Sequence, residues 1–223
     1  MTFKEYPDRD LLAIDLANAL AGELENCLLR HEHASFAVPG GTSPGPVFDV
    51  LCAADLDWGR VHVMLTDERW VPQDHARSNA RLIQDRLLTD RAARAVFLPF
   101  YAPAEDPEAV LAEVTAPLVP ELPLSVLLMG MGTDMHVASL FPGAPGIEAA
   151  LAPDAPILVA QSPPTQPEAR VSLSARVLDG ALSKHLLITG EEKRAALERA
   201  MALPPEEAPI NAVLSETTIH WAP

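Results

Sequence analysis

The sequence predicts an α/β fold with a mainly parallel sheet and helices on both faces. Short apolar runs alternate with helical patterns, which is typical of parallel strands joined by helical crossovers. Each apolar run ends at glycine or at a polar cluster, as expected where a buried strand enters a loop. The expected strands cover residues 36–38, 61–65, 126–129 and 186–188, and the expected helices cover 8–30, 44–52, 78–88 and 191–202.

The first helix has the clearest pattern, because leucines recur at a four-residue spacing from Leu12 to Leu28 and mark one buried face. Near the other end, residues 219–221 are expected to form a closing edge strand. The Pro-rich stretch 162–167 is expected to be a long mobile loop. No composition break divides the chain, so we expect one domain over residues 1–223.

Composition excludes several classes of function. The formal net charge of −15 repels nucleic acid and anionic lipid, and no apolar run is long enough to cross a membrane. The first residues lack the pattern of a secretion signal. Cys27 and Cys52 are expected to be free thiols, as in a reducing compartment, so we expect a cytoplasmic protein. An anionic small substrate would need a local cluster of basic residues.

Four polar or glycine-rich clusters follow the four expected strands. Ligands of open parallel sheets bind beyond the carboxyl ends of the strands, so these clusters are expected to share one crevice. The first contains Gly40, Gly41, Thr42 and Ser43. Its free N–H groups suit an anion, with a plain tight turn as the alternative.

In the same cluster, Ser43 is a fitting N-cap and Pro44 a fitting first residue of the next helix. The segment 41–45 also matches the G-x-S-x-G pattern of a serine-hydrolase elbow. We reject a serine nucleophile because Pro44, the residue after the serine, has no N–H for an oxyanion hole.

The second cluster places Asp67 and Arg69 after a strand, followed by Ser78 and Asn79. The guanidinium of Arg69 suits a phosphate, although an ion pair with no further role is the alternative. Ser78 is expected to cap the following helix, and Asn79 could face a ligand.

The third cluster, residues 130–143, carries Gly132, Asp134 and His136. An irregular turn can bring the carboxylate to the imidazole, and histidine titrates where a general base must. A helix-capping aspartate beside an incidental histidine is the alternative. A metal site is not expected here, because zinc needs three or more ligands and the spacing supplies no others.

The fourth cluster places Lys193 in the first turn of a helix, which is the wrong end for a cation unless an anion binds there or Glu191 and Glu192 compensate. Arg170 is a second candidate for the same anion. The remaining histidines are interpreted as surface or core residues; they are His31, His33, His62, His75, His185 and His220.

Together these motifs resemble the 6-phosphogluconolactonases of the pentose phosphate pathway. The resemblance covers most of the chain: residues 40–44, residues 67–72 with 78–79, residues 130–143, and Gly190 with Lys193. It implies a Rossmann-like domain, no required cofactor, and hydrolysis of 6-phosphogluconolactone to 6-phosphogluconate. The implied partner is this small sugar phosphate, and the protein is expected to be a monomer or a small homo-oligomer.

The resemblance also implies roles for individual residues. His136 would be the base that activates water, and Asp134 would hold or polarise the site. Arg69 and Lys193, with Arg170, would bind the phosphate. The remaining candidates would shape the pocket or contact substrate oxygens, and they are Gly40, Gly41, Thr42, Ser43, Asp67, Asn79 and Gly132.

The chain departs from the family pattern at two places. It has Thr42-Ser43 where the family has Ser-Thr, and Met135 stands where the family has glycine before the histidine. Glycine permits positive φ there and methionine does so less easily. Met135 could therefore alter the loop geometry, reduce the activity or change the substrate. The alternatives are therefore a glucosamine-6-phosphate deaminase-like enzyme and a catalytically impaired sugar-phosphate-binding protein. The deaminase pattern has a glutamate after the histidine loop, where this chain has residues 139–142.

Overall fold

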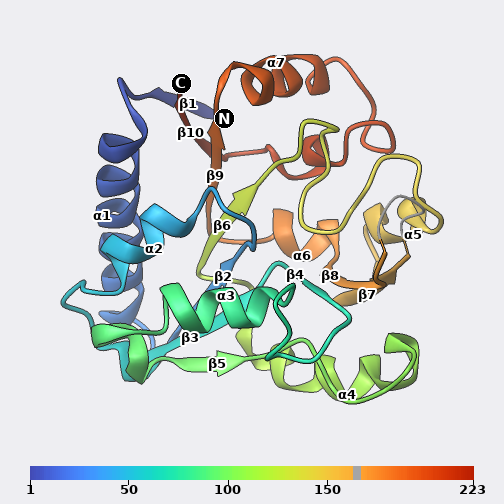
Figure 1. Ribbon diagram of the computed structural model, residues 1–223, viewed down its shortest axis with the longest axis horizontal. Coiled ribbons are helices and arrows are strands. Elements are labelled where there is room, and N and C mark those ends of the chain that lie inside the picture. The colour runs from blue at the N-terminus through green and yellow to red at the C-terminus, as the bar shows by residue number, and fades with distance from the viewer. Residues whose placement is uncertain (163–166) are drawn as a thin grey trace.

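The computed structural model describes residues 1–162 and 167–223, and within them the main sheet has seven strands (Figure 1). Their order is β1-β10-β9-β6-β2-β3-β5, and every neighbouring pair is parallel. The strands are β1 (Thr2–Glu5), β2 (Ala34–Val38), β3 (Val61–Leu65), β5 (Val96–Leu98), β6 (Val126–Gly130), β9 (Ser183–Thr189) and β10 (Thr218–Ala222).

Helices cover both faces of this sheet. In Figure 1, α1 (Arg9–Leu28) and α2 (Gly45–Leu51) lie together on one side, and α6 (Ala175–Asp179) and α7 (Glu191–Ala200) lie on the other. The predicted fold class is therefore confirmed. The other helices are α3 (Asn79–Arg86), α4 (Leu111–Thr115) and α5 (Ile147–Leu151), with short 3₁₀ turns η1 (Trp58–Arg60), η2 (Asp90–Arg94), η3 (Pro107–Val110), η4 (Ala116–Glu121) and η5 (Pro209–Val213). None of the helices described is both long and apolar enough to span a bilayer.

A second, antiparallel sheet of three short strands was not predicted. It consists of β4 (Asp67–Arg69), β8 (Arg170–Leu173) and β7 (Leu158–Gln161), in the order β4-β8-β7. Its β4 strand is made only of charged residues, so the sequence has no apolar alternation there. The pairing sets Arg69 directly opposite Arg170, which brings two cations to one place.

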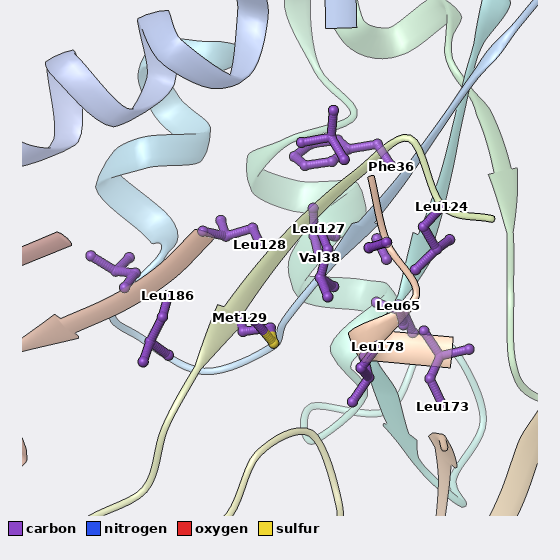
Figure 2. Close-up of a cluster of buried hydrophobic side chains, with 14 of the residues drawn as sticks. Phe36, Val38, Leu65, Leu124, Leu127, Leu128, Met129, Leu173, Leu178 and Leu186 are labelled. Carbon is purple, nitrogen blue, oxygen red and sulfur yellow. The ribbon is translucent and has the colours of Figure 1, made fainter. Parts of the chain in front are cut away.

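The core lies between the sheet and its helices. All five leucines from Leu12 to Leu28 in α1 are buried, as predicted. The central strand β6 is covered on both faces, so Leu127 and Leu128 are both buried although they point to opposite sides. Figure 2 shows part of this cluster, in which β2 and β6 meet Leu65, Leu173 and Leu178.

Some predicted boundaries and positions were wrong. Residues 219–221 form part of β10, but β10 lies between β1 and β9 and is not an edge strand. The edge strand next to β10 is β1, whose four residues are all exposed and carry no apolar pattern. Ser43 does not cap α2: Pro44 occupies the N-cap and Gly45 is the first helical residue.

Ser78, by contrast, caps α3 by accepting a hydrogen bond from the Arg81 N–H. Each predicted helix ends one or two residues beyond its observed end, where helices fray. The loop predicted at 162–167 lies mostly outside the described residues.

A line of polar side chains ties α1 to β9 and β10. The Tyr6 hydroxyl donates to Asp15 (2.6 Å) and contacts His220 Nδ1 (2.9 Å). His220 Nε2 lies 3.0 Å from His185 Nδ1, and His185 Nε2 lies 2.8 Å from the Glu23 carboxylate. Burial, with the nearby charges of His185 and Lys4, lowers the pKa of His220 to about 3.

A buried carboxylate fixes the start of α3 against β4. Glu68 accepts hydrogen bonds from the N–H groups of Arg69 (2.7 Å), Asn79 (2.7 Å) and Ala80 (2.8 Å), and from the Ser78 hydroxyl (2.9 Å). Two of these donors are N–H groups of the first helical turn, which have no partner inside the helix. Burial raises the pKa of Glu68, and the four hydrogen bonds oppose that rise. Glu68 therefore holds Asn79 in place.

We expect the His220 imidazole to make folding stability pH-dependent. Its pKa is lower in the folded protein than in the unfolded chain, so the unfolded state binds the extra proton below about pH 6.5. The free energy of unfolding should fall as pH drops from 6.5 towards 4.5, with a contribution of up to about 1.4 kcal/mol per pH unit. Urea denaturation at several pH values measures this slope. His220→Gln should reduce the slope and the exposed His31→Gln should not; equal slopes would refute the assignment.

Glu68→Gln should destabilise the protein by about 2–4 kcal/mol. The amide NH₂ group would replace one carboxylate oxygen and would face N–H or O–H groups that now donate hydrogen bonds to that oxygen. The free energy of unfolding in urea is the measurement. Glu105→Gln, an exposed site, is the matched control and should stay within about 0.5 kcal/mol of the parent. A Glu68 variant as stable as this control would show that the carboxylate does not hold α3.

Candidate active site

A cavity of about 320 Å³ opens at the carboxyl ends of β2, β3, β6 and β9. Residues of all four predicted clusters line it, so the expected convergence is observed. Of the predicted site residues, all but Asp134 line the cavity: Gly40, Gly41, Thr42, Ser43, Asp67, Arg69, Asn79, Gly132, His136, Arg170 and Lys193. Asp134 does not line the cavity itself but contacts His136, which does.

The loop after β2 passes very close to α3. A Cβ atom on Gly40 would lie 2.0 Å from Asn79 Oδ1, so any side chain at this position would displace the Asn79 amide. Gly41 has a φ of +87°, which L-residues rarely adopt. The backbone of this loop therefore forms one wall of the cavity.

Asn79 links this wall to Arg69. Its side-chain amide donates to the Asp67 carbonyl (2.8 Å), and its Oδ1 accepts from Arg69 Nη1 (2.7 Å). Arg69 also donates to the Arg77 carbonyl (2.9 Å). Arg69 Nε is buried and has no hydrogen-bond partner among the described residues. The Arg69 guanidinium is thus fixed in orientation, and its Nε–H group can still donate a hydrogen bond to a ligand.

Asp67 and Arg170 line the cavity together with Arg69. Arg170 Nη1 lies 3.8 Å from the Asp67 carboxylate, and both side chains are largely buried. Burial lowers the pKa of Arg170 and the Asp67 charge opposes this. Asp67 also accepts a 2.6 Å hydrogen bond from the buried Ser139 hydroxyl. Ser139 was not predicted, because a serine inside an irregular loop carries no distinguishing sequence signal.

His136 also lines the cavity and is held by Asp134. The distance from His136 Nδ1 to Asp134 Oδ1 is 2.5 Å. Because a carboxylate only accepts, Nδ1 carries the hydrogen, and Nε2 is the nitrogen available to a ligand. Burial raises the pKa of Asp134, but hydrogen bonds from His136 outweigh it and leave this pKa below its ordinary value. The Phe141 ring packs 4.5 Å from the imidazole.

This pair depends on the backbone of the loop after β6. A Cβ atom on Gly132 would lie 2.2 Å from His136 Nδ1 and 2.3 Å from Asp134 Oδ1, so any side chain would separate the pair. Met135 has a φ of 69°, in the left-handed region that favours glycine. Its N–H donates to the Gly132 carbonyl (2.9 Å) and its carbonyl accepts from Ile210 (3.2 Å). Methionine therefore keeps a glycine-like turn.

Lys193 completes the cavity from the first turn of α7. It is half-buried, and this burial lowers its pKa. Within residues 1–162 and 167–223 the ammonium has no ion pair or hydrogen bond, and the exposed Glu191 and Glu192 of the same helical turn do not pair with it. A cation left in this position beside a helix N-terminus suits a bound anion.

Arg69, Arg170 and Lys193 thus face the cavity, and among the described residues Asp67 is the only carboxylate that lines it. The local charge is positive although the chain as a whole carries −15. The arrangement can hold a dianionic group at one end of a ligand and present an oriented imidazole to the other.

Comparisons with known proteins agree with this geometry. Residues 7–221 match the family model described as glucosamine-6-phosphate isomerases/6-phosphogluconolactonase. A protein of Pseudomonas aeruginosa named 6-phosphogluconolactonase is 41% identical over 213 residues, which cover 93% of this chain and 89% of that protein.

Solved structures show the same fold. The crystal structure of a 6-phosphogluconolactonase from Shewanella baltica superposes with a TM-score of 0.96 at 31% identity and covers 100% of this chain and 98% of that one. A monomeric glucosamine-6-phosphate deaminase shares the fold at a TM-score of 0.83 and 16% identity, covering 100% and 97%. The fold alone therefore does not separate these activities. By the match over nearly its whole length and the identity to its relatives, the chain belongs to the glucosamine-6-phosphate isomerase/6-phosphogluconolactonase family.

Proposed function

We propose that this enzyme hydrolyses 6-phosphogluconolactone to 6-phosphogluconate. One observation carries the proposal: an imidazole oriented by a carboxylate shares a single cavity with three cations. The phosphate of the substrate matches the cations, and the lactone carbonyl needs a base that activates water. The relatives with about 40% identity carry the name of this activity, whereas the deaminase structure is only 16% identical to this chain.

In the proposed mechanism, His136 Nε2 removes a proton from water as the water oxygen bonds to the lactone carbonyl carbon. The bond from that carbon to the ring oxygen then breaks, and the His136 imidazolium returns the proton to the departing oxygen. Asp134 stabilises the imidazolium through its 2.5 Å contact with Nδ1. No cofactor enters these steps.

The other side chains bind the substrate. Arg69 and Lys193 hold the phosphate, and Arg170 adds a third charge to it. Asp67 and Asn79 shape the pocket by fixing the two arginines. The N–H groups of the 40–43 loop lie at the wall of the cavity, where they can bind substrate oxygens.

We place the enzyme in the cytoplasm. Cys27 and Cys52 both carry free thiols, which suits a reducing compartment.

The activity can be tested with 6-phosphogluconolactone generated in situ, by comparing acid release with the spontaneous rate. His136→Ala should lower kcat by about 10²-fold or more because the base is lost. Lys193→Ala should instead raise KM by about tenfold or more, because a charged partner of the phosphate is lost.

Arg30→Ala, a change at an exposed cation outside the cavity, is the control and should leave both constants unchanged. Binding of 6-phosphogluconate should survive in His136→Ala and weaken in Lys193→Ala. Parent protein that does not exceed the spontaneous rate would refute the lactonase. Release of ammonia from glucosamine-6-phosphate would assign the deaminase instead.

The positive φ of Met135 predicts how activity responds to its replacement. Met135→Gly should retain kcat within a few-fold, because the turn already has the conformation that glycine adopts freely. Met135→Val should lower kcat about tenfold or more, because a β-branched residue resists this conformation and a small displacement of His136 is costly. Steady-state kinetics on all three proteins is the measurement. A valine variant with parent activity would show that this turn does not position the imidazole.

A further inference from the structure

Two histidines and a glutamate meet at the amino ends of β2 and β3, at the edge of the sheet opposite the cavity. His33 immediately precedes β2, His62 is the second residue of β3, and Glu121 ends η4. Glu121 Oε1 lies 2.9 Å from His62 Nδ1, and Glu121 Oε2 lies 3.2 Å from His33 Nε2. The two imidazole rings stack at a centroid distance of 4.4 Å with 10° between their planes.

Glu121 is buried although the histidines are partly exposed. Its side chain is 5% exposed, against 36% for His33 and 24% for His62. Its Oε2 is buried and has no hydrogen-bond partner among the described residues, because His33 Nε2 is near it without the alignment of a hydrogen bond. Such an oxygen is costly to bury, so it points to a ligand that completes the cluster.

These atoms match the donor set of a transition-metal site. One nitrogen from each histidine and one carboxylate oxygen all lie within 4.8 Å of one another. Ligands that bind zinc at about 2.0–2.2 Å in a tetrahedron lie about 3.3–3.6 Å apart. The two nitrogen–oxygen distances here are slightly shorter, 2.9 Å to Glu121 Oε1 and 3.2 Å to Glu121 Oε2, so small side-chain rotations would bring one oxygen and both nitrogens to an ion. Two imidazoles and a carboxylate leave a position open for water, and the exposed imidazole edges leave a path for the ion.

We infer that His33, His62 and Glu121 bind a divalent transition-metal ion of the zinc class. The ion would join the start of β2, the start of β3 and the segment that leads into β6. It would bind the unpartnered Glu121 oxygen, and the two partly exposed imidazoles would turn out of their stack so that the lone pair of each neutral ring points at the ion. The cavity lies beyond the other ends of β2 and β3, so this site is separate from the proposed lactone hydrolysis and does not depend on it.

The alternative is a polar cluster in which the carboxylate only accepts hydrogen bonds from two imidazoles. That cluster would bind no metal above the level of isolated surface histidines. Direct measurement of binding therefore decides between the two.

Full-length protein freed of metal by a chelator would be titrated with Zn²⁺ by calorimetry. We expect one equivalent to bind with a micromolar or tighter Kd, and the melting temperature to rise on zinc addition. Co²⁺ in place of zinc should give the visible absorption of a tetrahedral or five-coordinate site. Anomalous scattering at the zinc edge should place the ion between His33, His62 and Glu121.

His33→Gln and His62→Gln should each weaken zinc binding by at least tenfold and abolish the thermal shift. Both residues are partly exposed, so these variants should remain folded. His31→Gln removes a neighbouring exposed histidine and His136→Gln removes the imidazole of the cavity; both should keep the full equivalent of zinc. Unchanged binding in His33→Gln and His62→Gln, loss of the equivalent in His136→Gln, or no binding by the parent would each overturn the inference.

Discussion

The buried Glu68 carboxylate is the constraint on which the geometry of the cavity depends. It binds the first N–H groups of α3 and the N–H of Arg69, so helix and strand cannot shift relative to one another. Asn79 is thereby fixed beneath Gly40 and beside Arg69, and Arg69 is fixed opposite Arg170. An acid that never contacts the cavity thus sets the spacing of two of its cations.

The cations also explain how an acidic protein can bind an anionic substrate. Most of the surface repels a phosphate, but Arg69, Arg170 and Lys193 lie in a recess where screening by water and salt is reduced. The partial desolvation of Lys193 lowers its pKa, so its charge is held at some cost until an anion arrives. Pairing of β4 with β8 sets Arg69 opposite Arg170, so the backbone keeps these two cations close together despite their repulsion.

Sequence patterns predicted the parts of the structure that follow local rules. Buried parallel strands are continuous apolar runs, and their carboxyl ends must meet, so the convergence of Gly40, Asp67, His136 and Lys193 could be inferred. The β1 strand could not, because its side chains are exposed and the strand with which it pairs lies more than 200 residues away. The role of Glu68 was hidden for a similar reason, since its partners come from a separate helix.

The loop around His136 shows a different limit. Its sequence has Met135 where the family has glycine, yet the turn keeps the positive φ that glycine would favour, and this conformation cannot be inferred from the sequence. The strain of a methionine there is on the order of 1–2 kcal/mol, and contacts such as the Ile210 hydrogen bond offset it. The group of His33, His62 and Glu121 was equally invisible, because these residues are far apart in the chain and share no spacing pattern.

The position of β10 between β1 and β9 has a consequence for synthesis on the ribosome. Among the described strands, translation makes β1 before all the others, yet its only partner in that set is β10, the last of them to be made. The nascent chain must therefore carry an unpaired β1 and an open edge of β9 until β10 emerges. Such edges invite association between chains. The β1 strand has only four residues, and two of them, Lys4 and Glu5, are charged. These charges disfavour pairing between chains before β10 is made.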